Sequence, residues 1–234
     1  MASSPLLEVR DVECSLGKKE HIFHNVDFVV NEGDVVILQG KSGCGKSTLL
    51  KCLAHLNVYT GEVKFRGKTP KEYGIPKFRT HVLYVPQRPS MLPGTPRDFM
   101  QRICNFNALK SRVQADSGSQ ISNEARAIDI AEQWGIEEEL WDRPWSNLSG
   151  GESQRVALAA ALGLNSADVL LLDEPTSALD SQTTAEVEGY LAGMLSKDEC
   201  RTKAMVWITH SSEQGSRVGT RFLSISSETL HEDS

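Results

Sequence analysis

Residues 35–56 combine three features that leave few folds open to this chain. The short apolar run VVILQ is followed by the glycine-rich loop 40-GKSGCGKST-48, and leucines then recur at helical spacing through residue 56. The loop matches the pattern G-x-x-x-x-G-K-[ST] through Gly40, Gly45, Lys46 and Ser47. Glycines in such a loop let successive backbone N–H groups converge on phosphate oxygens. We therefore expect a buried strand, a phosphate-binding loop and a helix in direct succession.

This loop predicts most of a nucleotide site. Lys46 is expected to reach the terminal phosphates and the Ser47 hydroxyl to ligate Mg²⁺, with Cys44 as a small residue that fills the loop. A glycine-rich turn that binds nothing is the alternative, and the strand and helix on either side argue against it. The residues predicted to bind nucleotide here are Gly40, Ser42, Gly43, Cys44, Gly45, Lys46, Ser47 and Thr48.

The rest of the chain alternates apolar strands with helices. Strands are expected at 6–14, 21–30, 62–65, 81–85, 169–173, 204–209 and 222–225, and helices at 152–163 and 181–195, with residues 226–234 frayed. This order predicts an α/β fold with a mainly parallel sheet, an antiparallel N-terminal part and ligands beyond the carboxyl ends of the strands. Polar, helical residues 96–145 predict an inserted lobe. We expect one domain, 1–234, with a core at about 1–87 and 150–234 and a helical lobe at about 88–149.

Composition removes several classes of protein. The chain has 25 Lys+Arg against 31 Asp+Glu, a net charge of −6, which argues against a general nucleic-acid binder. We see no signal peptide, and no apolar run reaches the ~20 residues that span a bilayer. Five cysteines without a CxxC pair fit a reducing compartment and predict neither a disulfide framework nor a zinc site.

Two adjacent carboxylates follow the apolar run 169-VLLLD-173. Asp173 ends that run and Glu174 comes next. At the end of a buried strand in a protein with a phosphate-binding loop, the first acid helps to hold Mg²⁺ and the second can polarise a water for attack on the γ-phosphate. A solvated turn is the alternative for an isolated pair, and the four apolar residues before this pair favour the catalytic interpretation.

The stretch 148-LSGGE-152, taken with the phosphate-binding loop and VLLLDEPTSALD, resembles the ATP-binding-cassette (ABC) ATPases over about residues 6–226. The resemblance implies that LSGGE does not bind the ATP of its own chain. It implies instead that Ser149 and Gly151, with Gly150 between them, donate to the γ-phosphate of ATP held by a second subunit. A head-to-tail dimer of two copies would then close two such sites.

Further residues match the family one at a time. Gln87, in 82-VLYVPQRPS-90, is similar to the Q-loop glutamine that contacts Mg²⁺ or the water. His210, in 205-MVWITH-210, is similar to the switch histidine near the γ-phosphate. Asp180 is similar to the D-loop aspartate, and it can equally be the N-cap of the helix that follows. The resemblance therefore implies Glu174, His210 and Gln87 as catalytic residues, Ser47, Gln87 and Asp173 as Mg²⁺ ligands, and Asp180 as a nucleotide-site residue.

One position departs from the family pattern. The aromatic residue that usually stacks on adenine falls at or near Leu16, and leucine lacks a ring face. Phe23 or His21 are the candidates to replace it. We therefore predict weak adenine stacking and comparable turnover of ATP and GTP.

The resemblance implies an ATPase subunit that drives a separate integral membrane transporter subunit. We expect it at the cytoplasmic face of a membrane, without nucleic acid as a partner. The segment YVPQRPSMLPGTPRDF is similar in sequence to the corresponding segment of small cassettes linked to metal-ion export. The alternatives are a soluble ABC ATPase of an assembly complex, such as the iron–sulfur type, and a nucleotide-gated scaffold. Residues 88–103 are expected to form the groove for the membrane partner, where Met91, Leu92, Phe99 and Met100 either face that partner or pack inside the lobe.

Overall fold

The computed structural model describes residues 4–17, 20–88, 93–113, 121–197 and 199–233. The chain divides into two compact units. The sheet unit comprises Met1–Tyr84, Asp168–Glu174 and Thr202–Ser234, and the helical unit comprises Val85–Ala167 and Pro175–Arg201.

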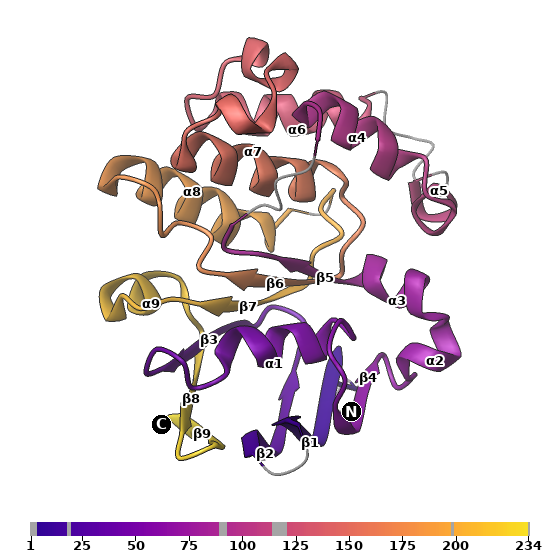
Figure 1. Ribbon diagram of the computed structural model, residues 1–234, viewed down its shortest axis with the longest axis vertical. Helices are drawn as coiled ribbons and strands as arrows, with labels where there is room; N and C mark the ends of the chain where they lie inside the picture. The colour runs from indigo at the N-terminus through magenta and orange to yellow at the C-terminus, as the bar shows by residue number, and fades with distance from the viewer. Residues whose placement is uncertain (1–3, 18–19, 89–92, 114–120, 198, 234) are drawn as a thin grey trace. The chain divides into compact units, whose positions relative to one another are not determined.

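A six-stranded sheet with the order β5-β6-β7-β3-β8-β9 forms the centre of the sheet unit (Figure 1). Strand β3 pairs in parallel with β7 and β8, and β6 pairs in parallel with β7. Every residue of β6 and β7 is buried, as expected for central parallel strands covered on both faces. The strands are β3 (Val35–Gly40), β5 (Val82–Val85), β6 (Val169–Asp173), β7 (Ala204–Ile208), β8 (Arg221–Ser226) and β9 (Thr229–Asp233). The predicted α/β class and its parallel strands are confirmed.

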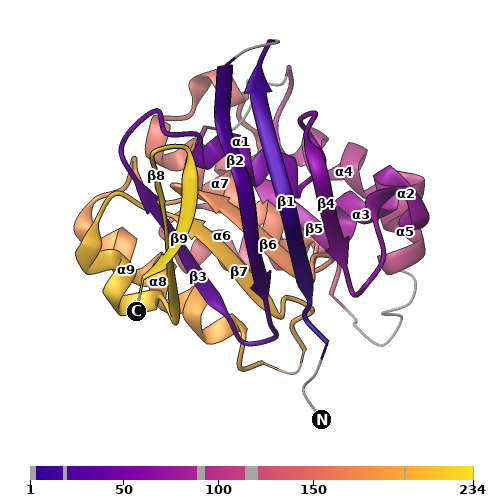
Figure 2. The ribbon, with the colours of Figure 1, turned by 90° about the horizontal axis from the view of Figure 1, so that it is seen from below.

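A second, antiparallel sheet has the order β2-β1-β4 and is seen broadside in Figure 2. Its strands are β1 (Leu7–Leu16), β2 (Glu20–Val30) and β4 (Thr60–Phe65). Helix α1 (Lys46–Leu53) packs on strands of both sheets and buries Leu49, Leu50 and Leu53 completely. Its leucines therefore join the two sheets into one apolar core. The remaining helices of this unit are α2 (Pro70–Tyr73), α3 (Ile75–His81) and α9 (Ser212–Val218).

The helical unit is built around the contact of α6 with α7. A Cβ at Gly163 would lie 2.5 Å from the Cβ of Ala127, so these two small residues allow the helices to approach closely. The helices are α4 (Pro96–Cys104), α5 (Asn107–Val113), α6 (Asn123–Glu132), α7 (Gly150–Gly163) and α8 (Ser181–Met194), with 3₁₀ turns η2 (Glu138–Asp142) and η3 (Trp145–Asn147). Helices α7 and α8 belong to this unit, although the helical lobe was predicted to end at about residue 149. The single-domain organisation stays a prediction.

The end of the chain differs from expectation. Residues 226–234 were expected to be frayed, but Thr229–Asp233 forms β9 and pairs antiparallel with β8, from Phe222↔Asp233 to Ser226↔Thr229. The prediction failed because backbone pairing with β8 does not require an apolar sequence. Among the described helices, none has both the length and the hydropathy needed to cross a membrane.

Candidate active site

The glycine-rich loop runs from the end of β3 at Gly40 to the start of α1 at Lys46. Gly40 and Gly45 have φ values of 144° and 97°, in the region that favours glycine. A Cβ at Gly45 would come within 2.6 Å of Ile22, and one at Gly40 within 2.8 Å of the Ile225 carbonyl oxygen. The neighbouring residues thus leave no room for a side chain at Gly40 or Gly45. The backbone N–H groups of such a loop are the donors that bind phosphate oxygens.

The Lys46 ammonium group lies folded against this loop. Its side chain is buried, and Nζ donates to the carbonyl oxygens of Gly40 at 2.8 Å and Lys41 at 3.0 Å. Among the described residues, no carboxylate lies within ion-pair distance of Lys46. A buried cation that faces only neutral carbonyls favours an anionic ligand at this position.

Asp173 is held by two hydroxyl groups at the carboxyl end of β6. Ser47 Oγ donates to its Oδ1 at 3.0 Å, and Tyr84 Oη donates to its Oδ2 at 2.7 Å. Burial, followed by the hydrogen bond to Asp173, raises the pKa of Tyr84 above its ordinary value. Oxygen atoms are the ligands that Mg²⁺ prefers, so the Ser47–Asp173 pair fits that ion. Tyr84 was not among the predicted site residues, because its hydroxyl reaches the site from β5, the neighbouring strand.

Glu174 and His210 meet beside this pair. Glu174 Oε1 lies 2.9 Å from His210 Nε2, and the Glu174 N–H donates to the Ile208 carbonyl oxygen at 3.2 Å. The Glu174 backbone has φ 47°, a left-handed conformation that is uncommon for a non-glycine residue and recurs at functional sites. Strands β6 and β7 thus bring together two residues that lie 36 positions apart in sequence.

In the helical unit, the predicted residues occupy the starts of helices and one loop. Gln87 Nε2 donates to Ser177 Oγ at 3.3 Å. Asp180 is the N-cap of α8, because Oδ1 accepts from Thr183 N–H at 3.0 Å and Oδ2 from Thr183 Oγ1 at 2.8 Å. The backbone bond from Thr183, more than the hydroxyl bond, lowers the pKa of Asp180. The N-cap interpretation of Asp180 is confirmed, and its role at a nucleotide site stays a prediction.

The LSGGE segment begins α7. Ser149 is the N-cap and forms a capping box with Glu152: Glu152 N–H donates to Ser149 Oγ at 3.2 Å, and Ser149 N–H donates to Glu152 Oε2 at 2.7 Å. Ser149 is exposed, and a Cβ at Gly150 would meet nothing within 4 Å. The Ser149 hydroxyl accepts one hydrogen bond, from the Glu152 N–H. Gly151 lies closer to neighbouring chain, where a Cβ would be 3.2 Å from the Ala178 carbonyl oxygen.

The hairpin of β1 and β2 carries the residues considered for stacking on adenine. Leu16 is 67% exposed, whereas Phe23 is completely buried, so Phe23 cannot replace the missing aromatic residue. His21 is exposed, with Nδ1 3.3 Å from Ser15 Oγ and its ring 5.7 Å from that of His24. Of the two candidates, His21 therefore remains.

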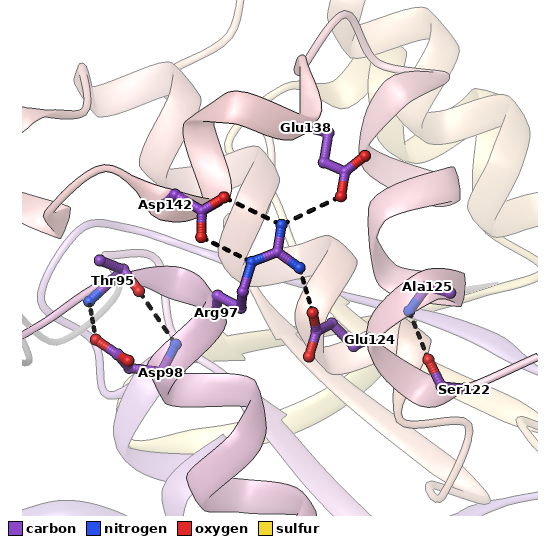
Figure 3. Close-up of polar contacts among 8 residues, drawn as sticks. All are labelled: Thr95, Arg97, Asp98, Ser122, Glu124, Ala125, Glu138 and Asp142. Atoms are coloured by element: carbon purple, nitrogen blue, oxygen red, sulfur yellow. Dashed lines mark hydrogen bonds and ion pairs between the residues drawn. The ribbon is translucent and has the colours of Figure 1, made fainter.

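The helical unit contains a cluster of charges that the sequence did not reveal. Arg97, at the start of α4, binds Asp142 through Nε at 2.7 Å and Nη2 at 3.2 Å, reaches Glu138 at 3.2 Å, and pairs with Glu124 (Figure 3). These carboxylates come from η2 and α6, so one guanidinium group joins three elements. The hydrogen bond from Arg97 lowers the pKa of Asp142. Nothing in the local sequence pairs residues 27 to 45 positions apart.

The four apolar side chains predicted for the partner groove divide differently. Met100 is completely buried, because α4 turns it inward. Phe99 is half-buried, with its ring 6.0 Å from that of Trp145. Met91 and Leu92 lie outside the described residues. The alternative of packing inside the lobe therefore applies to Met100.

Comparisons with known proteins agree with this geometry. A family model described as ABC transporter matches residues 23–177. The phosphate import ATP-binding protein PstB 1 of Enterococcus faecalis is 30% identical, over 92% of this chain and 84% of that protein. The arginine transport ATP-binding protein ArtM of Bacillus subtilis is 32% identical, over 97% and 90%.

Solved structures give the same result. The dimeric cassette MJ0796, bound to ADP and Pi in a post-hydrolysis state, has a TM-score of 0.80 at 27% identity, with 97% of both chains covered. The buried Lys46 in a bare-backbone loop and the oxygen pair of Ser47 and Asp173 suit the polyphosphate and the Mg²⁺ of such a site. The chain therefore belongs to the ABC transporter family, as an ATPase that binds ATP with Mg²⁺ and is the ATP-binding subunit of a transporter.

Proposed function

We propose that two copies of this chain close head-to-tail around two ATP molecules and thereby drive a separate membrane subunit. Each site would combine two sets of residues. One copy contributes Lys46, Ser47, Gln87, Asp173, Glu174 and His210, and the other contributes Ser149 and Gly151. The observation that carries the proposal is the contact of Glu174 Oε1 with His210 Nε2 at 2.9 Å, next to Asp173. A carboxylate held at a strand end by a histidine is suited to orient a water.

Each residue then has a defined task in hydrolysis. Lys46 and the loop N–H groups hold the terminal phosphates, which now replace the loop carbonyls as partners of the ammonium group. Ser47 and Asp173 hold Mg²⁺, which when bound neutralises charge on the phosphate oxygens. Glu174 accepts a proton from the attacking water. The water oxygen bonds to the γ-phosphorus while the bond between the γ-phosphorus and the oxygen that leaves with ADP breaks. His210 keeps the Glu174 carboxylate in place.

The second copy completes the site with an exposed helix start. Ser149 and Gly151 lie in the first turn of α7, a 14-residue helix whose N-terminus favours negative charge. The exposure of Ser149 and the open space around Gly150 support contact with another chain. Gln87 and Asp180 lie in the helical unit together with Ser149. A displacement of these residues on closure would therefore be transmitted to the rest of that unit.

The proposed partner is an integral membrane subunit at the cytoplasmic face of a membrane. The names of PstB 1 and ArtM, phosphate import and arginine transport proteins, support a transporter role. Neither name supports metal-ion export, and the cargo of this chain stays a prediction. A soluble ATPase of an assembly complex is the alternative, and the partner that copurifies separates the two.

The test uses Glu174→Gln, with the exposed Glu186→Gln on α8 as the matched control. We expect Glu174→Gln to bind ATP, to lose hydrolysis by at least about 100-fold and to form a stable dimer with ATP in light scattering. Glu186→Gln should behave as wild type. A Glu174→Gln chain that stays monomeric at saturating ATP would contradict the homodimer, and one that hydrolyses ATP within tenfold of wild type would contradict the role of Glu174.

The same variant identifies the partner. Affinity capture with ATP from gently solubilised membranes should recover a polytopic membrane protein. Recovery of soluble partners alone, from membranes and cytosol, would favour the assembly-type alternative.

A further inference from the structure

Gln154 is a buried polar side chain for which the proposed mechanism has no task. It lies in α7, five residues after Ser149, and only 4% of it is exposed. Its Nε2 donates to the Gln87 carbonyl oxygen at 3.1 Å, and its Oε1 accepts from the Ala178 N–H at 3.0 Å. One carboxamide thus spans two loops that lie about 90 residues apart in sequence.

Ser177 strengthens this link. Gln87 Nε2 donates to Ser177 Oγ at 3.3 Å, and Gln154 Nε2 lies 3.5 Å from the same oxygen. The main chain and the side chain of Gln87 are therefore both tied to residues 177–178. That segment leads directly to Asp180, which caps α8 through Thr183.

The chemistry of the link requires an amide. Gln154 uses one end as a donor and the other as an acceptor, each toward a backbone group. Glutamate has the same shape but lacks the N–H donor and would bring a charge into a buried position. Methionine fills similar volume with neither function. A buried amide with both ends bonded is the kind of group that fixes one arrangement of its neighbours.

We propose that Gln154 is a positioning residue that makes the segment at Gln87 and the loop of residues 174–180, which ends at Asp180, move as one piece. This inference rests on the proposed function, because that function gives Gln87 and Asp180 their tasks at the nucleotide. Closure against a second copy would then set both loops together, and α7, which begins at the LSGGE segment, carries the connection. Ser177 is the second member of the link.

The first experiment measures the link itself by hydrogen exchange. Gln154→Met is compared with Gln133→Met, in which the lost glutamine is exposed at the end of α6. The Ala178 amide should exchange about tenfold faster in Gln154→Met and at the wild-type rate in Gln133→Met. Unchanged exchange at Ala178 would overturn the inference, whatever the activity.

The second experiment measures the consequence. Gln154→Met should lower kcat about tenfold while KM for ATP changes less than twofold, because Lys46 and its loop are untouched. Ser177→Ala, which removes one partner, should lower kcat about threefold and serves if Gln154→Met does not fold. Faster exchange at Ala178 with wild-type kcat would also overturn the proposal, since the link would then be structural only. Failure of the proposed function would appear separately, as a Glu174→Gln chain that still hydrolyses ATP.

Discussion

The two units hold their polar residues in different ways. In the sheet unit, Asp173, Glu174 and His210 follow the ends of β6 and β7, whose residues are all buried. Hydroxyl and imidazole groups hold the carboxylates, but backbone pairing and apolar packing set the places of the main chain. In the helical unit, side chains do this: Arg97 binds three carboxylates, and Arg155 donates to the Trp134 and Gly151 carbonyl oxygens at 2.8 and 3.3 Å.

This difference has physical consequences. Apolar burial does not depend on the protonation of side chains and is strengthened by excluded salts, whereas charge pairs near water are weakened by salt and by protonation of the carboxylates. The ends of β6 and β7 in the sheet unit should therefore respond to lost side-chain volume, and the Arg97 cluster of the helical unit to ionic conditions. Hydrogen exchange followed separately in peptides from each unit can test this contrast.

The largest effect should come from the core of the sheet unit. Leu171, in the middle of β6, is completely buried, so Leu171→Ala should destabilise that unit by about 3 kcal/mol. Faster exchange in β3, β6 and β7 is the measurement, and Val58→Ala, at a side chain 92% exposed, is the control. A loss below about 1 kcal/mol would remove the first half of the comparison.

A smaller effect is expected at Arg97. Arg97→Met leaves three carboxylates without their cation, and because the site is partly exposed the loss should be about 2 kcal/mol, confined to α4, α6 and η2. The loss should shrink in 1 M salt. Arg102→Met, at an exposed position on the same helix, is the control. An effect that is equal at low and high salt would mean that the packing of the arginine stem, and not its charge, holds these elements.

Leu16 tests whether the nucleotide site of the sheet unit lacks a stacking surface. Leu16→Phe should tighten ATP binding about fivefold, the range of one aromatic contact. The wild type should turn over ATP and GTP at comparable rates. Strict preference for ATP in the wild type would show that another group, with His21 the first to substitute, already contacts the base.

The smallest effect concerns pH. The backbone hydrogen bond from Ser149, ahead of its hydroxyl, lowers the pKa of Glu152 below the ordinary 4.5. The capping box therefore contributes its full stabilisation above pH 4.5 and loses it as pH falls through the lower folded pKa. The free energy of opening at the start of α7, measured by hydrogen exchange, should fall as the pH is lowered, by less than about 1 kcal/mol. In Glu152→Gln this dependence on pH should be weaker. An unchanged pH dependence in Glu152→Gln would show that the capping box does not cause it.

How far the sequence predicted the molecule follows from the same contrast. The strand at 169–173, the helix predicted at 181–195 and found at Ser181–Met194, and the loop at 40–48 could be predicted, because each is a local pattern of apolar spacing or glycines. Tyr84 and Gln154 were not, since the partner of Tyr84 lies 89 positions away and those of Gln154 lie 24 and 67 positions away. Strand β9 was not predicted because its polar residues pair through the backbone. Two alternatives stayed open for Met100 because the sequence alone does not show which face of a helix such as α4 is buried.

The left-handed backbone at Glu174 puts stability and catalysis in opposition. A glutamate held at φ 47° costs of order 1 kcal/mol or more, and asparagine tolerates this conformation better. A search for more stable variants would therefore favour Glu174→Asn, which shortens the side chain and removes the carboxylate. At this position, improvement of the fold selects against turnover, so thermostable lines of this protein should be screened for hydrolysis before they are used.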